Sequence, residues 1–330
     1  MDWHKQLRVM TTPLLEKVKD NQNLTYYYLL REILEKPDHE SEVAQLRKQL
    51  VQEILEKQLE NGSWKNKVYN YEQGTTHQVM KLLDLGVDIT NDSIKKAVTY
   101  MFSFQSAAGY FTQGKKSCGA EANLIETNAA LMALSRAGYA DDPRVMKGYE
   151  WLCRWQQEDG SFLSPGAARR RKEGGYPYTY CGIHATCNTL LGLSTNEQMQ
   201  KSNAAVRGAD YLLGMYGKKY EIHGEVEPPL YRYMGEKPVS FEGAWHDPRI
   251  VPPEEGYIAA EDVDRKVEVF TTQHVLGTLA VLGYGLENET VKNGLSRLLK
   301  LVKEEDISLY TLMVIKRVHG PLTVFSFRGH

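Results

Sequence analysis

Carboxyl side chains at two places in the sequence could supply an acid. Asp262 and Asp264 lie two residues apart, directly after Glu261. Glu126 stands at the predicted start of a helix. Carboxylates that crowd together in a partly dry cavity repel one another, which raises one pKa and leaves a neutral acid able to protonate a substrate. The alternatives are a solvated acidic turn for the first group and a charge that caps its own helix for Glu126.

Histidine and cysteine side chains form a second group of candidates. Cys181, His184 and Cys187 fall within about 120° of one face of a predicted helix. Thiolate and imidazole are zinc ligands, so a metal site is one alternative, and buried cysteine without a function is the other. Without a metal, His184 could act as an acid or a base. His77 and His274 occupy similar places, in Thr-Thr-His-Gln and Thr-Thr-Gln-His, and each could exchange a proton at the rim of a cavity.

Aromatic side chains are frequent in the stretches before the helices that carry these histidines. Their ring faces stabilise positive charge without reacting with it, and they also line apolar binding sites. The pattern therefore predicts a ligand site without separating catalysis from binding. The residues predicted to contact a substrate are Tyr71, Tyr178, Tyr180, Tyr231, Trp245 and Phe270, together with Cys181 and Arg232.

A recurring helical unit must position these side chains. Four copies have a small polar start, an apolar stripe with helical spacing and, in three copies, a terminal glycine. Aligned on their threonines, they follow one another at steps of 51, 59 and 86 residues. Such a period with growing insertions is typical of a helical repeat. The aligned residues are Thr76, Thr127, Thr186 and Thr272.

A glycine turn precedes the first three copies. Each turn runs from a glutamine through a glycine to an aromatic residue, at Gln58–Trp64, Gln105–Phe111 and Gln156–Phe162. The glycine permits the tight turn, and the aromatic ring can pack back between helices.

Six short apolar helices are predicted to alternate with six longer amphipathic ones. An inner ring buried on both sides, surrounded by an outer ring wet on one side, requires this alternation. We therefore predict an all-α (α/α)6 toroid that forms a single domain over residues 1–330, with long loop insertions at 163–180 and 216–268. The inner helices are expected at 24–35, 74–86, 125–138, 181–193, 270–283 and 307–318. The outer helices are expected at 3–20, 39–58, 91–105, 141–156, 201–215 and 287–303.

Composition limits the classes of function. The 330 residues carry a formal net charge of −2, so no nucleic-acid partner is expected. No apolar run is long enough for a membrane span, and the first residues lack the layout of a signal peptide. Four cysteines do not indicate a disulfide framework. We expect a cytoplasmic protein with a small-molecule substrate, and homo-oligomer formation stays open.

The glycine turns between helices of a 50-residue repeat resemble the prenyltransferase and squalene-cyclase repeat superfamily, over about residues 39–303. Gln58–Trp64 and Gln156–Phe162 are the nearest copies. In class II terpene cyclases of this superfamily, the middle aspartate of Asp-x-Asp-Asp-Thr-Ala donates the proton. The corresponding stretch here is Asn123–Ala129, which keeps Glu126 but has Ile125 in place of that aspartate.

The zinc motif of protein prenyltransferases, Asp-x-Cys-Tyr, is absent from the sequence. Tyr178–Gly182 is similar to a Tyr-x-Cys-Gly stretch on inner helices of those enzymes. No cofactor is expected, with zinc or magnesium as open alternatives.

The resemblance implies a terpenoid cyclase/prenyltransferase-like enzyme that acts on an isoprenoid or other elongated apolar substrate in a central cavity by acid-initiated chemistry. One alternative is a lyase, isomerase or hydrolase that uses histidines and carboxylates on a polar substrate in the same cavity. Another is a non-catalytic ligand-binding or scaffold toroid. The basic stretch 169–172 could bind an anion at the mouth, or lie in a solvated loop.

Overall fold

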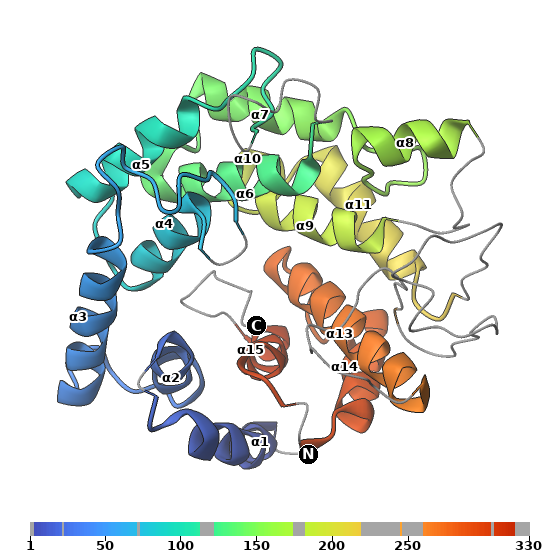
Figure 1. Cartoon of the computed structure of the whole chain (residues 1–330). Helices are drawn as coiled ribbons and strands as arrows, with labels where there is room; N and C mark the ends of the chain where they lie inside the picture. The colour runs from blue at the N-terminus through green and yellow to red at the C-terminus, as the bar shows by residue number, and fades with distance from the viewer. Residues whose placement is uncertain are drawn as a thin grey trace.

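The computed structural model describes residues 3–21, 23–70, 73–112, 122–173, 182–218, 245, 260–304 and 307–320. Helices make up most of this part of the chain, and it contains no strand, only isolated bridges in the turns. Figure 1 shows the helices arranged in two layers around a common centre. The predicted all-α class is confirmed.

Two sets of helices alternate along the chain, as predicted. The inner set consists of α2 (Leu24–Tyr28) with the π-helical η1 (Leu29–Ile33), α4 (Thr75–Asp84), α6 (Leu124–Leu134) with η2 (Ser135–Tyr139), α9 (Ile183–Leu193), α13 (Ala260–Val281) and α15 (Leu309–His319). The outer set consists of α1 (Trp3–Val18), α3 (Ser41–Leu55), α5 (Asp92–Phe102), α7 (Pro143–Cys153), α11 (Asn203–Gly214) and α14 (Glu289–Leu301). Two further helices are α8 (Pro165–Lys172) and the short α10 (Glu197–Gln200).

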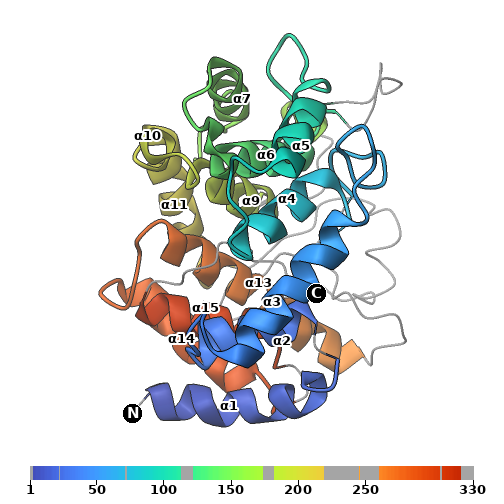
Figure 2. The ribbon, with the colours of Figure 1, turned by 90° about the vertical axis from the view of Figure 1, so that its left-hand side faces the viewer.

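Contacts between successive inner helices run around a closed circuit. Helix α4 packs on α6, α6 on α9, α9 on α13, α13 on α15, and α15 on η1. The circuit closes where the Tyr28 hydroxyl donates to Asp84 Oδ2 at 3.0 Å, linking α2 to α4. The first and last helices, α1 and α15, lie side by side (Figure 1, Figure 2). This arrangement is consistent with the predicted toroid.

A glutamine side chain joins each glycine turn to the following outer helix. Gln58 Nε2 donates to the carbonyl of Gly62 within its own turn, at 2.9 Å, and to the carbonyl of Ser93 in α5, at 2.8 Å. The same two bonds recur twice along the chain. Gln105 Nε2 donates to Gly109 and Arg144, and Gln156 Nε2 donates to Gly160 and Ala204.

The turn glycines are required for two separate reasons. Gly62, Gly109 and Gly160 all have positive φ, between 85° and 107°. A Cβ on any of them would also lie within 3.0 Å of a backbone carbonyl in the next outer helix. The turn therefore packs directly on the backbone of that helix, which only glycine allows.

A threonine at each inner-helix start holds the aromatic end of the turn. The backbone amide of Trp64 donates to Thr75 Oγ1 at 3.2 Å. Phe111 donates to Thr127 at 3.1 Å, and Phe162 donates to Thr186 at 2.9 Å. The predicted alignment on Thr76 is therefore wrong by one residue, because the bonded residue is Thr75. In the corrected register, His77 and His274 both lie two residues after the repeat threonine.

Two predicted loops contain helix. Residues 165–172 form α8, where Ser164 Oγ accepts the amide of Ala167 at 3.4 Å. Helix α13 begins at Ala260, ten residues before the predicted start at 270. Two side chains tie this early part to the neighbouring outer helix: Arg265 donates to the carbonyl of Leu301, and Glu268 pairs with Arg297 at 2.8 Å. An acidic turn around Asp262 is therefore wrong, because this segment is helical.

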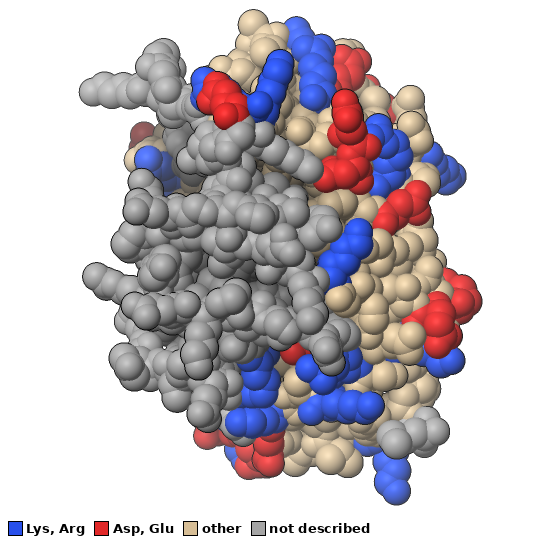
Figure 3. Space-filling model, turned by 90° about the vertical axis from the view of Figure 1, so that its right-hand side faces the viewer, with Lys and Arg blue, Asp and Glu red and all other residues tan. Residues whose placement is uncertain are grey.

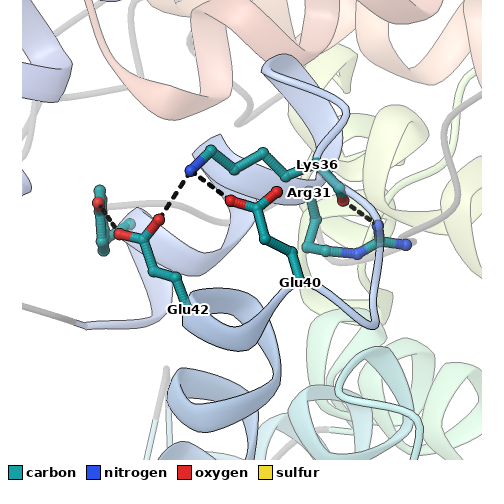
Figure 4. Close-up of polar contacts among 5 residues, drawn as sticks. Arg31, Lys36, Glu40 and Glu42 are labelled. Atoms are coloured by element: carbon teal, nitrogen blue, oxygen red, sulfur yellow. Dashed lines mark hydrogen bonds and ion pairs between the residues drawn. The ribbon is translucent and has the colours of Figure 1, made fainter.

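An ionic cluster joins the first inner helix to α3 (Figure 4). Lys36 Nζ donates to Glu40 at 2.9 Å and to Glu42 at 2.7 Å. The Tyr26 hydroxyl donates to the other oxygen of Glu42 at 2.5 Å. The hydrogen bond from Lys36, followed by that from Tyr26, lowers the pKa of Glu42.

A membrane or a charged partner would place requirements on the described helices and surface. None of the described helices combines the length and the apolar character needed to cross a lipid bilayer. On the side shown in Figure 3, acidic and basic side chains alternate over the described surface. That mixture agrees with the small formal net charge of −2.

Replacing Gly160 with alanine tests the docked turn. We expect Gly160→Ala to lower the free energy of unfolding by about 3 kcal/mol, because it combines a positive φ with a clash against the carbonyl of Arg207. Gly283→Ala has the positive φ without the clash and should cost about 1 kcal/mol. Gly214→Ala has neither and should leave stability unchanged or raised by up to about 1 kcal/mol. Urea unfolding of the three variants checks this order, and equal losses would contradict it.

The Glu42 cluster predicts a pH-dependent contribution to stability. Because the pKa of Glu42 is lowered on folding, its contribution is present above the unfolded pKa and is lost as pH falls through the folded pKa. The side chain is 44% exposed, so we expect Glu42→Gln to cost at most about 1 kcal/mol at pH 7. The difference from wild type should shrink below about pH 4. Glu56→Gln, at the end of the same helix, is the control. A Glu42→Gln effect that persists at low pH would rule out the ionic origin.

Candidate functional site

Three inner helices bring His184, His274 and Tyr310 together. The imidazole rings of His184 and His274 stack with centroids 5.3 Å apart and planes 26° from parallel. His274 Nδ1 shares a hydrogen bond with the Tyr310 hydroxyl at 3.1 Å. His184 and Tyr310 lie in the first turns of α9 and α15. The three side chains form what we call the histidine–tyrosine site.

Local sequence explains how α9 presents His184. Gly182, with φ of 109°, precedes the helix, and a Cβ there would press on Phe162 and Ser161. Two residues after His184, Thr186 accepts the amide of Phe162. The glycine turn therefore fixes the first turn of the helix on both sides of the histidine.

Helix α15 is held to α13 by two adjacent hydrogen bonds. Ser308 caps α15 by accepting the amide of Thr311 at 3.1 Å. Thr311 Oγ1 then donates to Gln273 Oε1 at 2.9 Å, next to the bond between His274 and Tyr310. The rings of the histidine–tyrosine site are thus oriented by neighbours in sequence as well as by one another. Imidazole and phenol in such contact can pass protons near neutral pH.

Buried polar contacts continue along the neighbouring inner helices. Asn128 in α6 donates to the carbonyl of Asn188 in α9, and Asn188 Nδ2 donates to the carbonyl of His184 at 2.9 Å. Gly192 makes room for Asn128, because a Cβ there would collide with its side-chain oxygen. On α4, His77 packs against the ring of Tyr69 at 5.4 Å. Buried polar side chains therefore link α6 to α9, and His77 of α4 contacts the segment before its own helix.

A charged cluster lies toward the C-terminal ends of the inner helices. Arg136 in η2 pairs with Asp84 of α4 at 2.5 Å, and Asp84 has no exposed side-chain surface. Tyr28 donates to the second oxygen of Asp84. Burial lowers the pKa of Arg317 to about 10, although the nearby Tyr310, Glu32 and Asp84 act in the other direction and raise it. We call the group formed by Tyr28, Glu32, Asp84, Arg136 and Arg317 the ring base.

Comparison with known protein families adds to this geometry. Residues 28–181 match the family model of the squalene-hopene cyclase C-terminal domain. The resemblance to the terpenoid cyclase and prenyltransferase repeat superfamily is therefore confirmed. No curated protein matches the chain. The matched region runs from α2 to just before α9, so it contains Glu126 and His77, whereas His184, His274 and Tyr310 lie beyond it.

The acids predicted from the sequence are positioned only in part. Glu126 lies in the first turn of α6 and is half-buried. Asp262 and Asp264 lie in the first turns of α13, and their side chains are outside the described residues. The role of these three residues as proton donors stays a prediction.

Most of the predicted substrate contacts lie outside the described residues, and Phe270 is partly buried on α13. Trp245 is fully buried: its Nε1 donates to the carbonyl of Leu212 at 2.6 Å, and its ring meets Tyr216 and Gly294. Thr272 Oγ1 donates to the carbonyl of Trp245 at 3.4 Å. Trp245 therefore packs in the core as the aromatic partner of this repeat threonine. The predicted contacts outside the described residues are Tyr71, Tyr178, Tyr180, Cys181, Tyr231 and Arg232.

The metal alternative gains no support from the described ranges. They contain no group of three or more histidine, cysteine, aspartate or glutamate residues placed to hold an ion. Cys187 is fully buried next to the polar contacts of α9, and Cys181 lies outside those ranges.

Sequence reasoning missed Tyr310 and the ring base. The available signal was a charged or polar residue on an otherwise apolar inner helix, as for Asp84 and Arg317. Such a residue must find a partner when the helix is buried, so it predicts a polar contact between inner helices.

Asp84→Asn tests the ring base. We expect it to lower the free energy of unfolding by about 3 kcal/mol, because it leaves the charge of Arg136 without its buried partner. Asp92→Asn is the matched control: Asp92 is 91% exposed and 3.9 Å from Lys95, so its loss should cost less than about 1 kcal/mol. Chemical unfolding of both variants provides the measurement. Equal effects would show that the buried pair contributes no more than a surface pair.

Proposed function

We propose that this protein is a terpenoid cyclase-like enzyme that binds an isoprenoid or other elongated apolar substrate where the inner helices begin. Its reaction is a proton-initiated rearrangement or cyclisation. The observation that carries the proposal is the meeting of His184, His274 and Tyr310 from three inner helices, in a chain whose residues 28–181 match the squalene-hopene cyclase C-terminal domain model.

The proposed reaction needs an acid, a stabilised cation and a base. A carboxylic acid, Glu126, Asp262 or Asp264, gives its proton to a carbon–carbon double bond, and a carbocation forms on the substrate. Aromatic rings next to the inner helices stabilise that cation until a neighbouring carbon loses a proton. His274 receives this proton, and Tyr310 holds its ring in place through Nδ1. The proton lost from the substrate balances the proton gained.

The acid in this scheme differs from that of class II terpene cyclases. Ile125 occupies the position of their middle aspartate, so the proton must come from another side chain. Glu126 is adjacent and half-buried at the same helix start. Asp262 and Asp264 begin the helix that also carries His274. These positions support a relocated acid.

The test combines ligand identification with activity. Native mass spectrometry of the purified protein, with metal analysis, should reveal a co-purified apolar molecule. Incubation with linear isoprenoids of increasing length, followed by gas chromatography and mass spectrometry, should then detect a cyclised or rearranged product. We expect His274→Gln to reduce the rate at least about 100-fold, because it removes the base. Among Glu126→Gln, Asp262→Asn and Asp264→Asn, the variant that removes the acid should show a loss of the same size.

Controls separate chemistry from folding. His39→Gln changes an exposed histidine and should keep full activity. Tyr310→Phe keeps the ring but removes the hydrogen bond to His274, so its rate should lie between those of wild type and His274→Gln. Full activity in His274→Gln, or in all three of Glu126→Gln, Asp262→Asn and Asp264→Asn, would contradict the mechanism.

A second function is favoured by the same histidine pair. Two stacked imidazoles with a phenol are also suited to moving a proton at carbon next to a carbonyl, as a lyase or isomerase acting on a polar substrate would require. Hydrolysis in the same site belongs to this alternative. Turnover of polar carbonyl substrates, with no product from any isoprenoid, would favour it. A bound ligand that is never converted would instead favour the non-catalytic alternative.

A further inference from the structure

Helix α9, which carries His184, is packed between two other inner helices. In Figure 1 it lies between α6 and α13, and it contacts both. His184 stacks on His274 of α13, with ring centroids 5.3 Å apart. The separation of the two imidazoles therefore depends on how α9 is seated on α6, as well as on its contact with α13.

One buried asparagine of α6 contacts α9 at two points. Asn128 Nδ2 donates to the backbone carbonyl of Asn188, whose own side chain donates to the carbonyl of His184 at 2.9 Å. The Oδ1 atom of Asn128 lies against Gly192, where a Cβ would come within 1.7 Å of it. Asn188 and Gly192 are four residues apart, so the amide spans about one turn of α9. Rotating α9, or sliding it along α6, would bring another side chain against this amide.

Two other helices also have a glycine that makes room for a neighbouring side chain, but there the side chain is leucine. A Cβ on Gly148 of α7 would lie 2.6 Å from Leu131, and one on Gly208 of α11 would lie 2.8 Å from Leu190. At Gly192 an asparagine takes the corresponding place. Close packing of helices in this chain therefore does not by itself require a polar side chain.

The asparagine has a cost that leucine would not have. Asn128 is 3% exposed, and its Oδ1 atom has no hydrogen-bond partner among the described residues. A buried acceptor without a donor lowers stability, because its hydration is lost and not replaced. What the side chain adds in return is a bond from Nδ2 to α9, which fixes direction as apolar packing does not.

We propose that Asn128 is a positioning residue for His184. Its amide fixes the rotation and the height of α9 on α6, and this sets the stacking of His184 on His274. Asn128 acts through the backbone of α9, so a change there should reduce turnover more than substrate binding. The effect on turnover rests on the proposed function, in which His274 accepts a proton, whereas the effect on the two rings does not.

Nuclear magnetic resonance of the histidine rings, combined with kinetics, tests the role. Stacked rings shift one another's Hε1 signals, and the signals of His184 and His274 are assigned by their loss in His184→Gln and His274→Gln. We expect Asn128→Ala to shift both signals and to leave that of the exposed His39 in place. With an isoprenoid that the wild type converts, kcat should fall about 10- to 100-fold while KM stays within about 2-fold.

A double variant separates the lost amide from a packing defect. Gly192→Ala alone should lower the urea midpoint of unfolding, because its methyl group meets Asn128. In Asn128→Ala/Gly192→Ala the methyl group enters the space that the amide leaves, so the midpoint should recover at least to that of Asn128→Ala. The shifted histidine signals and the low kcat should stay, since no amide bonds α9. Recovery of the wild-type signals in the double variant would overturn the proposal, because packing alone would then position α9.

Asn196→Ala is the matched control. Asn196 is 2% exposed, and its Nδ2 donates to the carbonyl of Ala140 at 2.9 Å, beyond the end of α9. Its loss should also lower the urea midpoint, but should leave kcat and the signals of both histidines unchanged. Equal shifts in Asn196→Ala, or unchanged signals in folded Asn128→Ala, would overturn the positioning role. If the wild type converts no isoprenoid, the proposed function fails, and the histidine signals still decide whether Asn128 positions His184.

Discussion

The hydrogen bonds from each turn glutamine organise this molecule. One side-chain amide bridges its own glycine turn and the next outer helix, so the position of one helix pair is transmitted to the following pair. The glycine brings the turn onto the helix backbone, and the threonine accepts the amide that follows. A helix pair buries too little surface to be stable alone, and this joint lets neighbouring pairs share one core.

The histidine–tyrosine site depends on the way each glycine turn is bonded to the next helix. Thr186 of α9 and Thr272 of α13 are each bonded to the aromatic residue of the preceding segment, so residues two positions before or after these threonines face the same region. His184 and His274 are such residues, from different repeats. His274 and Tyr310 are buried inside an apolar ring, and the hydrogen bond between them offsets part of the cost of burying these polar groups. The same condition applies to the carboxylate of Asp84 at the ring base.

Much of the fold could be predicted from the sequence, because periodicity and caps act locally. The six-fold alternation and the glycine turns were visible in the spacing of apolar residues and of glutamine, glycine and aromatic residues. The register of Thr75 was not, since two adjacent threonines are indistinguishable until one of them accepts the amide of Trp64. The early start of α13 depends on the contacts of Arg265 and Glu268 with a later helix, which no local pattern contains. The pairing of His184 with His274 could not be predicted either, because it joins two helices that are far apart in sequence. The acids and most aromatic candidates stay predictions.

The closure between α15 and η1 has a consequence for how the chain folds. Lys316 donates to the carbonyl of Glu32 and to the carboxylate of Glu35, across more than 280 residues of sequence. The other contacts between successive inner helices join elements that are closer in sequence, but this one, like the contact of α1 with α15, requires both ends of the chain. Contacts at such separation form slowly, because the entropy of a long loop must be lost first. The last helix also supplies Tyr310 to the histidine–tyrosine site. The chemistry proposed for this protein therefore depends on a helix whose placement requires both ends of the chain.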